Sequence, residues 1–366
     1  MSAHRTGPRR PKMIDMFAGA GLFSHAFAEE GFEPIQAVEL CRHACETYRL
    51  NLGDHVVQAD IRDVEPVGPC DIIVAGPPCQ GFSTLGKRQL RDPRNLLSFE
   101  VVKWAELTGA KVVVIENVAA FLESPIWTEL EGRFKALGYA VSARVLDATK
   151  FGVPQLRMRS FTIASKIGGP EISPLRGGLR TVREAFEGLE EPRATDDHLH
   201  RVRDLSPLAL RRIRSVPPGG DKRDIMRRHP DLVPKSWWAV HCEATDVWGR
   251  MGWDAPANTL RTAFINPSKG RYLHPVKDRV ITMREAARLH TIPDRWKFSG
   301  YDSYIARQIG NSVPPRMGRA VARAVAKLFN VGHSAPRSET HGHFNHAWRR
   351  AMNEIEADIR RLRRCA

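Results

Sequence analysis

The sequence predicts an α/β fold, a Rossmann-like parallel sheet covered by helices, with a smaller domain inserted into it. Three observations lead to this prediction. Short apolar runs alternate with longer amphipathic stretches from residue 13 to about residue 166. A glycine-rich turn, with Gly19 and Gly21, follows the first apolar run. Around Gly168 the composition changes to frequent Gly, Pro and Arg, and strands become hard to find, so a separate small domain is expected there.

Each strand is expected where a short apolar run is bounded by turn residues, and the amphipathic stretches between the runs are long enough for helices. The expected strands are 13–17, 34–39, 55–60, 71–75, 111–116, 139–147 and 160–165. The expected helices between them are 23–30, 42–50, 96–107 and 125–137.

Three more helices are expected after the inserted domain. The helix at 282–290 is predicted to begin at Thr282, because Glu285 stands three residues further on, as in a capping box. The other two are 304–308 and 317–329. The expected divisions of the chain are a basic N-terminal arm (1–12), the first part of the main domain (13–167), the inserted domain (168–270), the return segment of the main domain (271–330) and a basic tail (331–366).

The charge of the chain favours a polyanionic partner. Its 366 residues contain 56 Lys and Arg against 41 Asp and Glu, which gives a formal charge of +15. An excess of this size favours nucleic acid as a partner. Charge alone does not decide the function, because many solvated surfaces are basic without binding anything.

The cysteines are scattered, without a C-x-x-C pair, so we expect neither a metal site nor a disulfide framework, and a reduced cytosol fits best. No apolar run approaches the ~20 residues of a membrane helix. No apolar segment follows the basic N-terminus as it would in a signal peptide. An intracellular soluble protein is therefore expected. The six cysteines are Cys41, Cys45, Cys70, Cys79, Cys242 and Cys365.

The glycine-rich turn predicts a cofactor site, although a tight turn between strand and helix would also explain Gly19 and Gly21 alone. Glu39 stands 20 residues after Gly19, at the end of the second strand, where a carboxylate can accept both ribose hydroxyls. Asp60 ends the third strand at the same edge, in a suitable position for an adenine amino group. The third glycine of the dinucleotide pattern is missing, so a nucleoside cofactor such as S-adenosylmethionine is favoured over NAD.

Cys79 is a candidate nucleophile. It directly follows Pro77 and Pro78 beyond the fourth strand, and Gly81 comes two residues later. Open α/β sheets place their chemistry beyond the carboxyl ends of strands, and the prolines fix the backbone ahead of the thiol. A buried, inert cysteine is the usual alternative, but it would not explain the prolines and the glycine on either side of Cys79.

Glu116 and two arginines are candidates for the same site. Glu116 ends the apolar run 111–115, and partial burial would raise its pKa toward that of a proton donor. A carboxylate at a helix N-terminus is the alternative. Arg157 and Arg159 lie on one face of an extended segment, and the apolar residues that follow suggest that this face meets something acidic rather than solvent.

These motifs closely resemble, in their order, those of the DNA cytosine-5 methyltransferase family of the bacterial restriction–modification type. The likeness spans about residues 13–328 except the middle region, and it implies an S-adenosylmethionine-dependent methyltransferase fold with an inserted target-recognition domain. One departure is His290, where the family usually has Gln. The matching segments are 15–24, Glu39, Asp60, 77–80, 92–97, 116–118, 155–159, 284–289 and 308–315.

The resemblance implies transfer of a methyl group to carbon 5 of a flipped-out cytosine in a specific duplex sequence. Carbon 5 is a poor nucleophile until a thiolate adds to carbon 6, so Cys79 would form a covalent intermediate. Glu116 would contact the ring nitrogen and the exocyclic amine. Arg157 and Arg159 would hold the cytosine or a neighbouring phosphate and help to orient the cysteine.

The binding residues are also implied by the resemblance. Gln80 and Ser83 would bind the substrate, with Ser83 at the phosphate of the flipped nucleotide. The methyl donor would be S-adenosylmethionine, which leaves as S-adenosylhomocysteine. Its site would be lined by Phe17, Gly19, Gly21, Leu22, Glu39, Asp60, Ile61, Pro78, Leu97 and Asn311.

The implied partner is double-stranded DNA, which the region 168–270 would face across a cleft. Its basic side chains suit phosphate contacts, although a solvated basic face is the alternative for most of them. A monomer in the bacterial cytoplasm, associated with the nucleoid and not with a membrane, is expected. A cognate restriction endonuclease of the same system is a further partner, whose existence the sequence leaves open. These basic side chains are Arg211, Arg212, Lys222, Arg223, Arg227 and Arg228.

Three other functions fit the sequence less well. A transfer-RNA cytosine methyltransferase of the same fold would typically carry a Cys-Phe-Thr element, which does not occur here. A catalytically dead DNA-binding regulator would not need Cys79, Glu116 and Arg157 together. A nicotinamide dehydrogenase is disfavoured by the missing third glycine.

Overall fold

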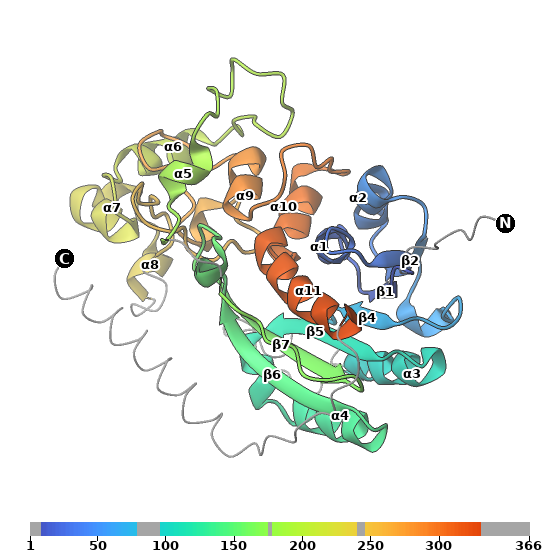
Figure 1. The fold of residues 1–366 in the computed structure, drawn as a ribbon. Coiled ribbons are helices and arrows are strands. Elements are labelled where there is room, and N and C mark those ends of the chain that lie inside the picture. The colour runs from blue at the N-terminus through green and yellow to red at the C-terminus, as the bar shows by residue number, and fades with distance from the viewer. Residues whose placement is uncertain (1–8, 79–95, 175–177, 240–245, 331–366) are drawn as a thin grey trace.

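The computed structural model describes residues 9–78, 96–174, 178–239 and 246–330. Within them, seven strands form one sheet in the order β3-β2-β1-β4-β5-β7-β6 (Figure 1). Each expected strand is confirmed, with its ends shifted by no more than two residues. The strands are β1 (Lys12–Met16), β2 (Glu33–Glu39), β3 (Val56–Gln58), β4 (Ile72–Ala75), β5 (Val112–Val118), β6 (Ala140–Asp147) and β7 (Met158–Ser165).

The direction of β7 shows that the prediction of a parallel sheet is wrong for this strand. The strands β1 to β5 pair in parallel, but β7 lies antiparallel between β5 and β6. The cause is the connection 148–157 between β6 and β7, which is too short for the helical crossover that a parallel return requires. A single 3-10 turn at its start reverses the chain instead.

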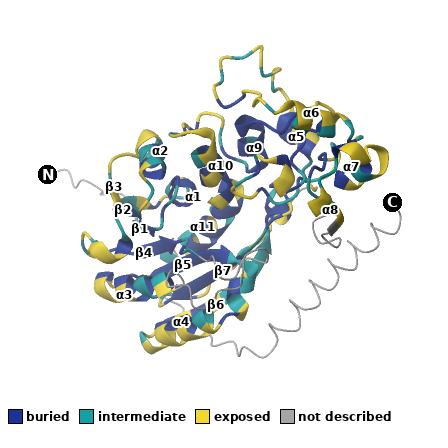
Figure 2. Cartoon of the chain, turned by 180° about the vertical axis from the view of Figure 1, so that it is seen from behind, coloured by how far each residue is buried: buried dark blue, intermediate teal, exposed yellow. Residues whose placement is uncertain are grey.

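Helices cover both faces of the sheet, because successive strand residues point to opposite faces. Met13 and Ile72 pack in one apolar cluster with α1 and α11. Ile14 and Ile73 point the other way, into a cluster with α3 and α4. Figure 2 shows the central strands buried and β6 at the edge of the sheet only partly buried, while the outer surfaces of the helices are exposed. These helices are α1 (Leu22–Ala28), α2 (Arg42–Leu52), α3 (Ser98–Thr108), α4 (Pro125–Ala136) and α11 (Pro315–Asn330).

The helix expected at 282–290 is confirmed as α9 (Met283–Leu289). The Oγ1 atom of Thr282 accepts a hydrogen bond from the backbone N–H of Glu285 at 3.2 Å, and the Glu285 carboxylate accepts one from the backbone of Thr282 at 2.7 Å. The predicted capping box is therefore present. The other two late helices are longer than expected, since α10 spans Asp302–Asn311 and α11 starts at Pro315.

The described parts of 168–270 contain short helices and irregular backbone, with no strand of the sheet. Their buried side chains share one apolar cluster with α9 and α10, so that Val182 and Leu260 belong to the same core as Ala286. Helices α5 to α8 gather at one end of the molecule (Figure 1). None of the described helices is long and apolar enough to cross a membrane. The short helices are α5 (Val182–Phe186), α6 (Pro207–Arg214), α7 (Lys222–Arg228) and α8 (Lys235–Ala239).

Candidate active site

The turn between β1 and α1 has an unusual backbone that leaves space beside Gly19. Phe17, Gly19 and Gly21 have φ angles of 61°, 54° and 83°, a conformation that favours glycine and is uncommon for phenylalanine. A Cβ atom on Gly19 would meet nothing within 4 Å, whereas one on Gly21 would lie 2.7 Å from Cδ1 of Leu52. Packing against α2 therefore requires Gly21, while Gly19 leaves room for a ligand. Leu22 begins α1 and is buried.

Glu39 ends β2 next to this turn. Its Oε2 atom accepts a hydrogen bond from the backbone N–H of Gly19, and Oε1 accepts one from that of Cys41, each at 2.8 Å. Burial raises the pKa of the Glu39 carboxyl, and the backbone N–H groups partly oppose the rise. Each carboxylate oxygen has a second lone pair, so the side chain can still accept two hydroxyl groups.

Asp60 follows β3 and caps the short 3-10 helix 61–63. Its two carboxylate oxygens accept hydrogen bonds from the guanidinium of Arg62 at 2.9 and 2.7 Å. These side-chain hydrogen bonds lower the pKa of Asp60 to about 2. Ile61 is buried in the apolar cluster against which Phe17 and Leu97 pack, so three of the expected cofactor residues belong to or pack against one cluster.

Glu116 lies inside β5 rather than at its end, because the strand continues to Val118. The alternative of a carboxylate at a helix N-terminus is therefore wrong. Glu116 is 8 % exposed, and its Oε1 atom forms an ion pair with Nε of Arg159 at 3.0 Å. Burial raises the pKa of Glu116, and the positive charges of Arg159 and Arg157 partly oppose the rise.

The segment that leaves β4 toward Cys79 lies beside Glu116. A Cβ atom on Gly76 would lie 3.9 Å from Oε2 of Glu116. The side-chain amide of Asn117 donates a hydrogen bond to the carbonyl oxygen of Pro77 at 3.4 Å. Pro78, the last described residue of this segment, is partly exposed. The expected site residues Cys79, Gln80 and Ser83 lie outside the described residues.

The two arginines of the 155–159 segment have different surroundings. Arg159 meets Glu116, the acidic partner that the sequence suggested. Arg157 is 1 % exposed and donates to the carbonyl oxygens of Gly310 at 2.9 Å and Ser312 at 3.0 Å. Burial lowers the pKa of Arg157 well below its usual value. Its Nε atom is buried and has no hydrogen-bond partner among the described residues.

Asn311 ends α10 and is exposed. The residues on either side of it are those whose carbonyl oxygens Arg157 holds. The backbone around Asn311 is therefore fixed from within the protein while its side chain remains accessible.

Several basic side chains expected at DNA phosphates are engaged within the chain. Arg211 pairs with Asp231, and Arg227 pairs with Asp224. The guanidinium of Arg212 lies over the rings of two tryptophans, 5.1 Å from the centroid of Trp237 and 5.5 Å from that of Trp248. Lys222 is buried and Arg223 pairs with Asp221. Arg228 is exposed at the end of α7.

Sequence reasoning missed a polar group of side chains in the core. Gln155 and His290 are both fully buried, and the Nε2 atom of Gln155 lies 3.0 Å from Nδ1 of His290. The only signal for it was the departure from the family pattern at His290. Leu40 was also missed, although an apolar residue directly after Glu39 and 67 % exposed is a candidate for contact with a cofactor.

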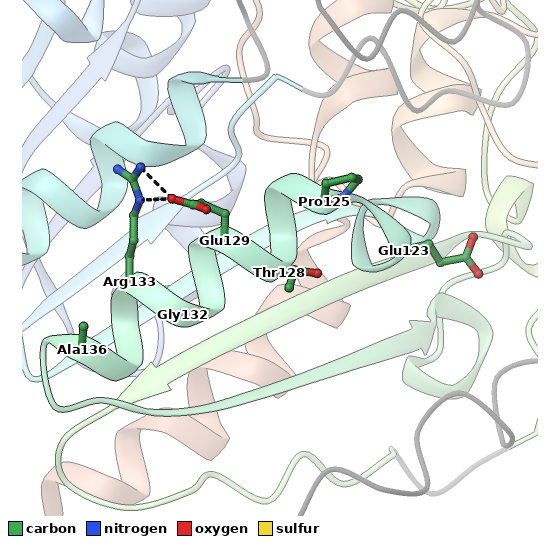
Figure 3. Close-up of a pocket in the computed structure, with 7 residues that line it drawn as sticks. All are labelled: Glu123, Pro125, Thr128, Glu129, Gly132, Arg133 and Ala136. Atoms are coloured by element: carbon green, nitrogen blue, oxygen red, sulfur yellow. Dashed lines mark hydrogen bonds and ion pairs between the residues drawn. The ribbon is translucent and has the colours of Figure 1, made fainter.

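A hollow on the surface of α4 is not part of this site. Figure 3 shows it along one side of the helix, with the ion pair of Arg133 and Glu129 at its rim. Neither Glu116 nor the glycine turn lines it. The residues that do are Glu123, Pro125, Thr128, Glu129, Gly132, Arg133 and Ala136.

Comparison with known proteins identifies relatives along most of the chain. A family model described as C-5 cytosine-specific DNA methylase matches residues 11–327. The type II methyltransferase M1.HphI of Haemophilus parahaemolyticus is 34% identical over 337 residues, which cover 86% of each chain. The type II methyltransferase M.NgoFVII of Neisseria gonorrhoeae is 30% identical over 341 residues, with 88% of each chain covered.

Solved structures share the fold. A putative DNA modification methyltransferase encoded within a prophage of E. coli superposes with a TM-score of 0.69 at 22% identity, over 88% of this chain and 100% of that one. The Dnmt2 methyltransferase of S. pombe gives a TM-score of 0.63 at 17% identity, over 88% of this chain and 99% of that one. Methyltransferases therefore share the arrangement of sheet and helices described above, as the sequence predicted.

Proposed function

The chain belongs to the C-5 cytosine-specific DNA methylase family and methylates cytosine in DNA with S-adenosylmethionine, and we propose that it does so through a covalent bond between Cys79 and a flipped-out cytosine. The observation that best supports this mechanism is the ion pair of Glu116 with Arg159, beside the segment that leads to Cys79. Burial raises the pKa of this carboxyl, which favours a role as a proton donor to a ring nitrogen.

The proposed reaction begins with the thiolate of Cys79. Its sulfur forms a bond to carbon 6 while the ring nitrogen N3 takes the proton of Glu116, so that the electron pair of the 5,6 double bond becomes available at carbon 5. Carbon 5 then bonds the methyl group. Loss of the carbon-5 proton to a solvent base and cleavage of the bond from sulfur to carbon 6 restore the ring, release the thiolate, and return the N3 proton to Glu116.

The residues at the cofactor edge fit the methyl donor. S-adenosylmethionine, when bound, supplies an electrophilic methyl group and leaves as S-adenosylhomocysteine. Open space beside Gly19 and the remaining lone pairs of Glu39 suit a nucleoside with two ribose hydroxyls. We assign Glu39 to the ribose and Asp60 to the adenine amino group. The other proposed cofactor residues are Phe17, Gly19, Gly21, Leu22, Ile61, Pro78, Leu97 and Asn311.

The DNA side of the site follows from the geometry of a base pair. Carbons 5 and 6 of a stacked cytosine are inaccessible, so the base leaves the duplex before Cys79 can reach it. Arg159, whose side chain is partly exposed beside Glu116, would hold the flipped cytosine or its phosphate. Arg157 would help to orient Cys79. Gln80 and Ser83 would bind the nucleotide, while the region 168–270 would recognise the flanking sequence.

The proposed setting is a restriction–modification system of a bacterium. Both relatives named above carry type II methyltransferase names. We propose that the chain acts as a monomer on double-stranded DNA, at the nucleoid in the cytoplasm, beside a cognate restriction endonuclease.

The mechanism is tested by trapping. Duplex DNA in which cytosine is replaced by 5-fluorocytosine should form a stable covalent adduct with the protein in the presence of S-adenosylmethionine, because fluorine cannot leave as a proton does. Cys79→Ser should form no adduct and transfer no methyl group, while it still binds the cofactor. Near-normal transfer by this variant would rule out the nucleophile.

The substrate class is tested separately with labelled S-adenosylmethionine. Duplex DNA should accept the label, and bisulfite sequencing should locate the methylated cytosines within one short recurring sequence. Transfer to tRNA without transfer to duplex DNA would contradict the proposed recognition of a duplex.

A further inference from the structure

His290 stands at the centre of a buried set of hydrogen bonds that joins distant parts of the chain. Its Nδ1 atom lies 3.0 Å from Nε2 of Gln155, and its Nε2 atom lies 2.9 Å from the carbonyl oxygen of Ser312. The imidazole is 0 % exposed, as is the side chain of Gln155. His290 therefore connects the segment before β7 with the turn between α10 and α11.

The partners of His290 determine its tautomer. The oxygen of Ser312 can only accept, so Nε2 of the imidazole must carry a hydrogen. The amide oxygen of Gln155 accepts from the backbone N–H of Leu260 at 3.0 Å, which directs the amide nitrogen of Gln155 toward the imidazole. That nitrogen donates, so Nδ1 of His290 must accept. A doubly protonated imidazole would place two donors against each other at this position.

The same set of hydrogen bonds includes Arg157. The carbonyl oxygen of Ser312 accepts from both His290 and the guanidinium of Arg157. Arg157 also donates to the carbonyl oxygens of Gly310 and Leu260. The backbone at Ser312 is thus held by both Arg157 and His290, that at Gly310 is held by Arg157, and Asn311 lies between these two residues.

We propose that His290 is a positioning residue for the methyl donor: through the Ser312 carbonyl it fixes the backbone that presents Asn311 to the cofactor. The inference rests on the proposed function, in which Asn311 is a cofactor contact. His290 itself is fully buried and acts only through its neighbours. The side chain at this position must accept a hydrogen bond from Gln155 and donate one to the carbonyl oxygen of Ser312, and it must be about as long as histidine to reach both.

This requirement separates three substitutions. In His290→Gln the amide nitrogen can occupy the place of Nε2 and donate to Ser312, so affinity for S-adenosylmethionine should stay within about twofold of wild type. In His290→Asn the amide oxygen can replace Nδ1 and accept from Gln155, but the shorter side chain does not reach Ser312. His290→Leu removes both contacts. The Asn and Leu variants should each bind S-adenosylmethionine about tenfold more weakly.

His200 provides a matched control. It is also a buried histidine with two hydrogen-bond partners, Oγ1 of Thr282 at 2.8 Å from Nδ1 and the carbonyl oxygen of Glu190 at 2.9 Å from Nε2, but neither partner belongs to the proposed site. His200→Leu should lower the midpoint of thermal unfolding as His290→Leu does. It should leave the affinity for the cofactor unchanged.

The measurements are the dissociation constant of S-adenosylmethionine by calorimetry, KM and kcat with duplex DNA, and the unfolding midpoint of each variant. The positioning role is supported if His290→Asn binds S-adenosylmethionine weakly while His290→Gln binds it as tightly as wild type does. The inference is overturned if His290→Asn binds like wild type, if the Gln variant is as weak as the Asn variant, or if His200→Leu weakens binding equally. Failure of the wild-type protein to bind S-adenosylmethionine would instead reject the proposed function.

Discussion

Arg159 and Glu116 form their ion pair, 3.0 Å from Nε to Oε1, as diagonal neighbours on adjacent strands. In the register of β5 with β7, Glu116 is opposite Phe161 and Arg159 is opposite Val118. Residues offset by two positions in this way lie on the same face of an antiparallel pair. The reversed direction of β7 therefore brings the guanidinium to the carboxylate, at the point where β4 leads toward Cys79.

Glu116→Gln tests the carboxyl as a proton donor. The amide keeps the size of the side chain and can still meet Arg159, but it cannot transfer a proton to the ring nitrogen. We expect kcat to fall by about 10²- to 10³-fold, the usual contribution of a general acid, with little change in cofactor affinity. Single-turnover transfer of labelled methyl groups to duplex DNA measures the effect.

The pH dependence of this variant gives a second check. Because burial raises the pKa of Glu116, the wild-type rate should fall as pH rises through that raised pKa, and the Gln variant should lack this part of the profile. Glu131→Gln is the control, since Glu131 is also buried and pairs with Lys135 in α4 at 2.9 Å. A loss of activity in the control equal to that in Glu116→Gln would count against a special role for Glu116.

Gly19→Ala and Gly21→Ala should separate cofactor binding from packing. Both residues have positive φ, so each alanine costs about 1–2 kcal/mol of backbone strain. At Gly21 the added methyl group also meets Leu52, which adds roughly 1–3 kcal/mol of overpacking. Gly19→Ala should carry only this strain and so lose less stability than Gly21→Ala, but it should bind S-adenosylmethionine about tenfold more weakly, because its methyl group enters the open space.

The comparison uses urea unfolding for stability and calorimetry for binding. Equal losses of stability in the two variants would show that the crowding at Gly21 is relieved by a shift of Leu52. Unchanged cofactor affinity in Gly19→Ala would place the ligand elsewhere.

The strands could be predicted from the sequence because their signals are local. Apolar runs bounded by turn residues located all seven strands, and Glu39 was expected at the end of the second strand, where β2 does end. The capping box at Thr282 was predictable for the same reason, since both partners lie within one turn of helix.

Features that depend on distant parts of the chain could not be predicted in this way. The direction of β7 depends on what a short connection permits, and the periodicity of a strand is the same in both directions. The carbonyl partners of Arg157 come from Leu260, Gly310 and Ser312, more than a hundred residues away, and backbone groups carry no signal in the sequence.

Asp15→Asn should change how stability depends on pH. Asp15 is buried, and desolvation raises its pKa from 3.8 to about 7, while a hydrogen bond from Ser24 opposes the rise. The folded chain thus binds this proton more tightly than the unfolded chain does. The stabilisation is complete below pH 3.8 and is lost as pH rises toward about 7, by at most about 4 kcal/mol.

Asparagine at this position can accept from Ser24 and does not titrate. The free energy of unfolding of Asp15→Asn, relative to wild type, should therefore increase between pH 5 and 8, as measured by urea titration at several pH values. A difference that stays constant over this range would show that Asp15 is ionised in the folded protein throughout.

Arg250→Met should strongly destabilise the region that contains residues 213–278, which lies outside the sheet. Arg250 is 3 % exposed, and its guanidinium donates to four carbonyl oxygens and to Asp278. Methionine fills similar space but leaves these buried acceptors without a donor, so we expect the free energy of unfolding to fall by about 3–5 kcal/mol.

Arg211→Met is the matched control, because the ion pair of Arg211 with Asp231 is exposed and contributes about 0–1 kcal/mol. Urea unfolding followed by tryptophan fluorescence reports on this region, since Trp248 and Trp253 pack in or against the same apolar cluster. Equal stability of the two variants would mean that water replaces the guanidinium of Arg250 and that Arg250 does not hold this part of the chain together.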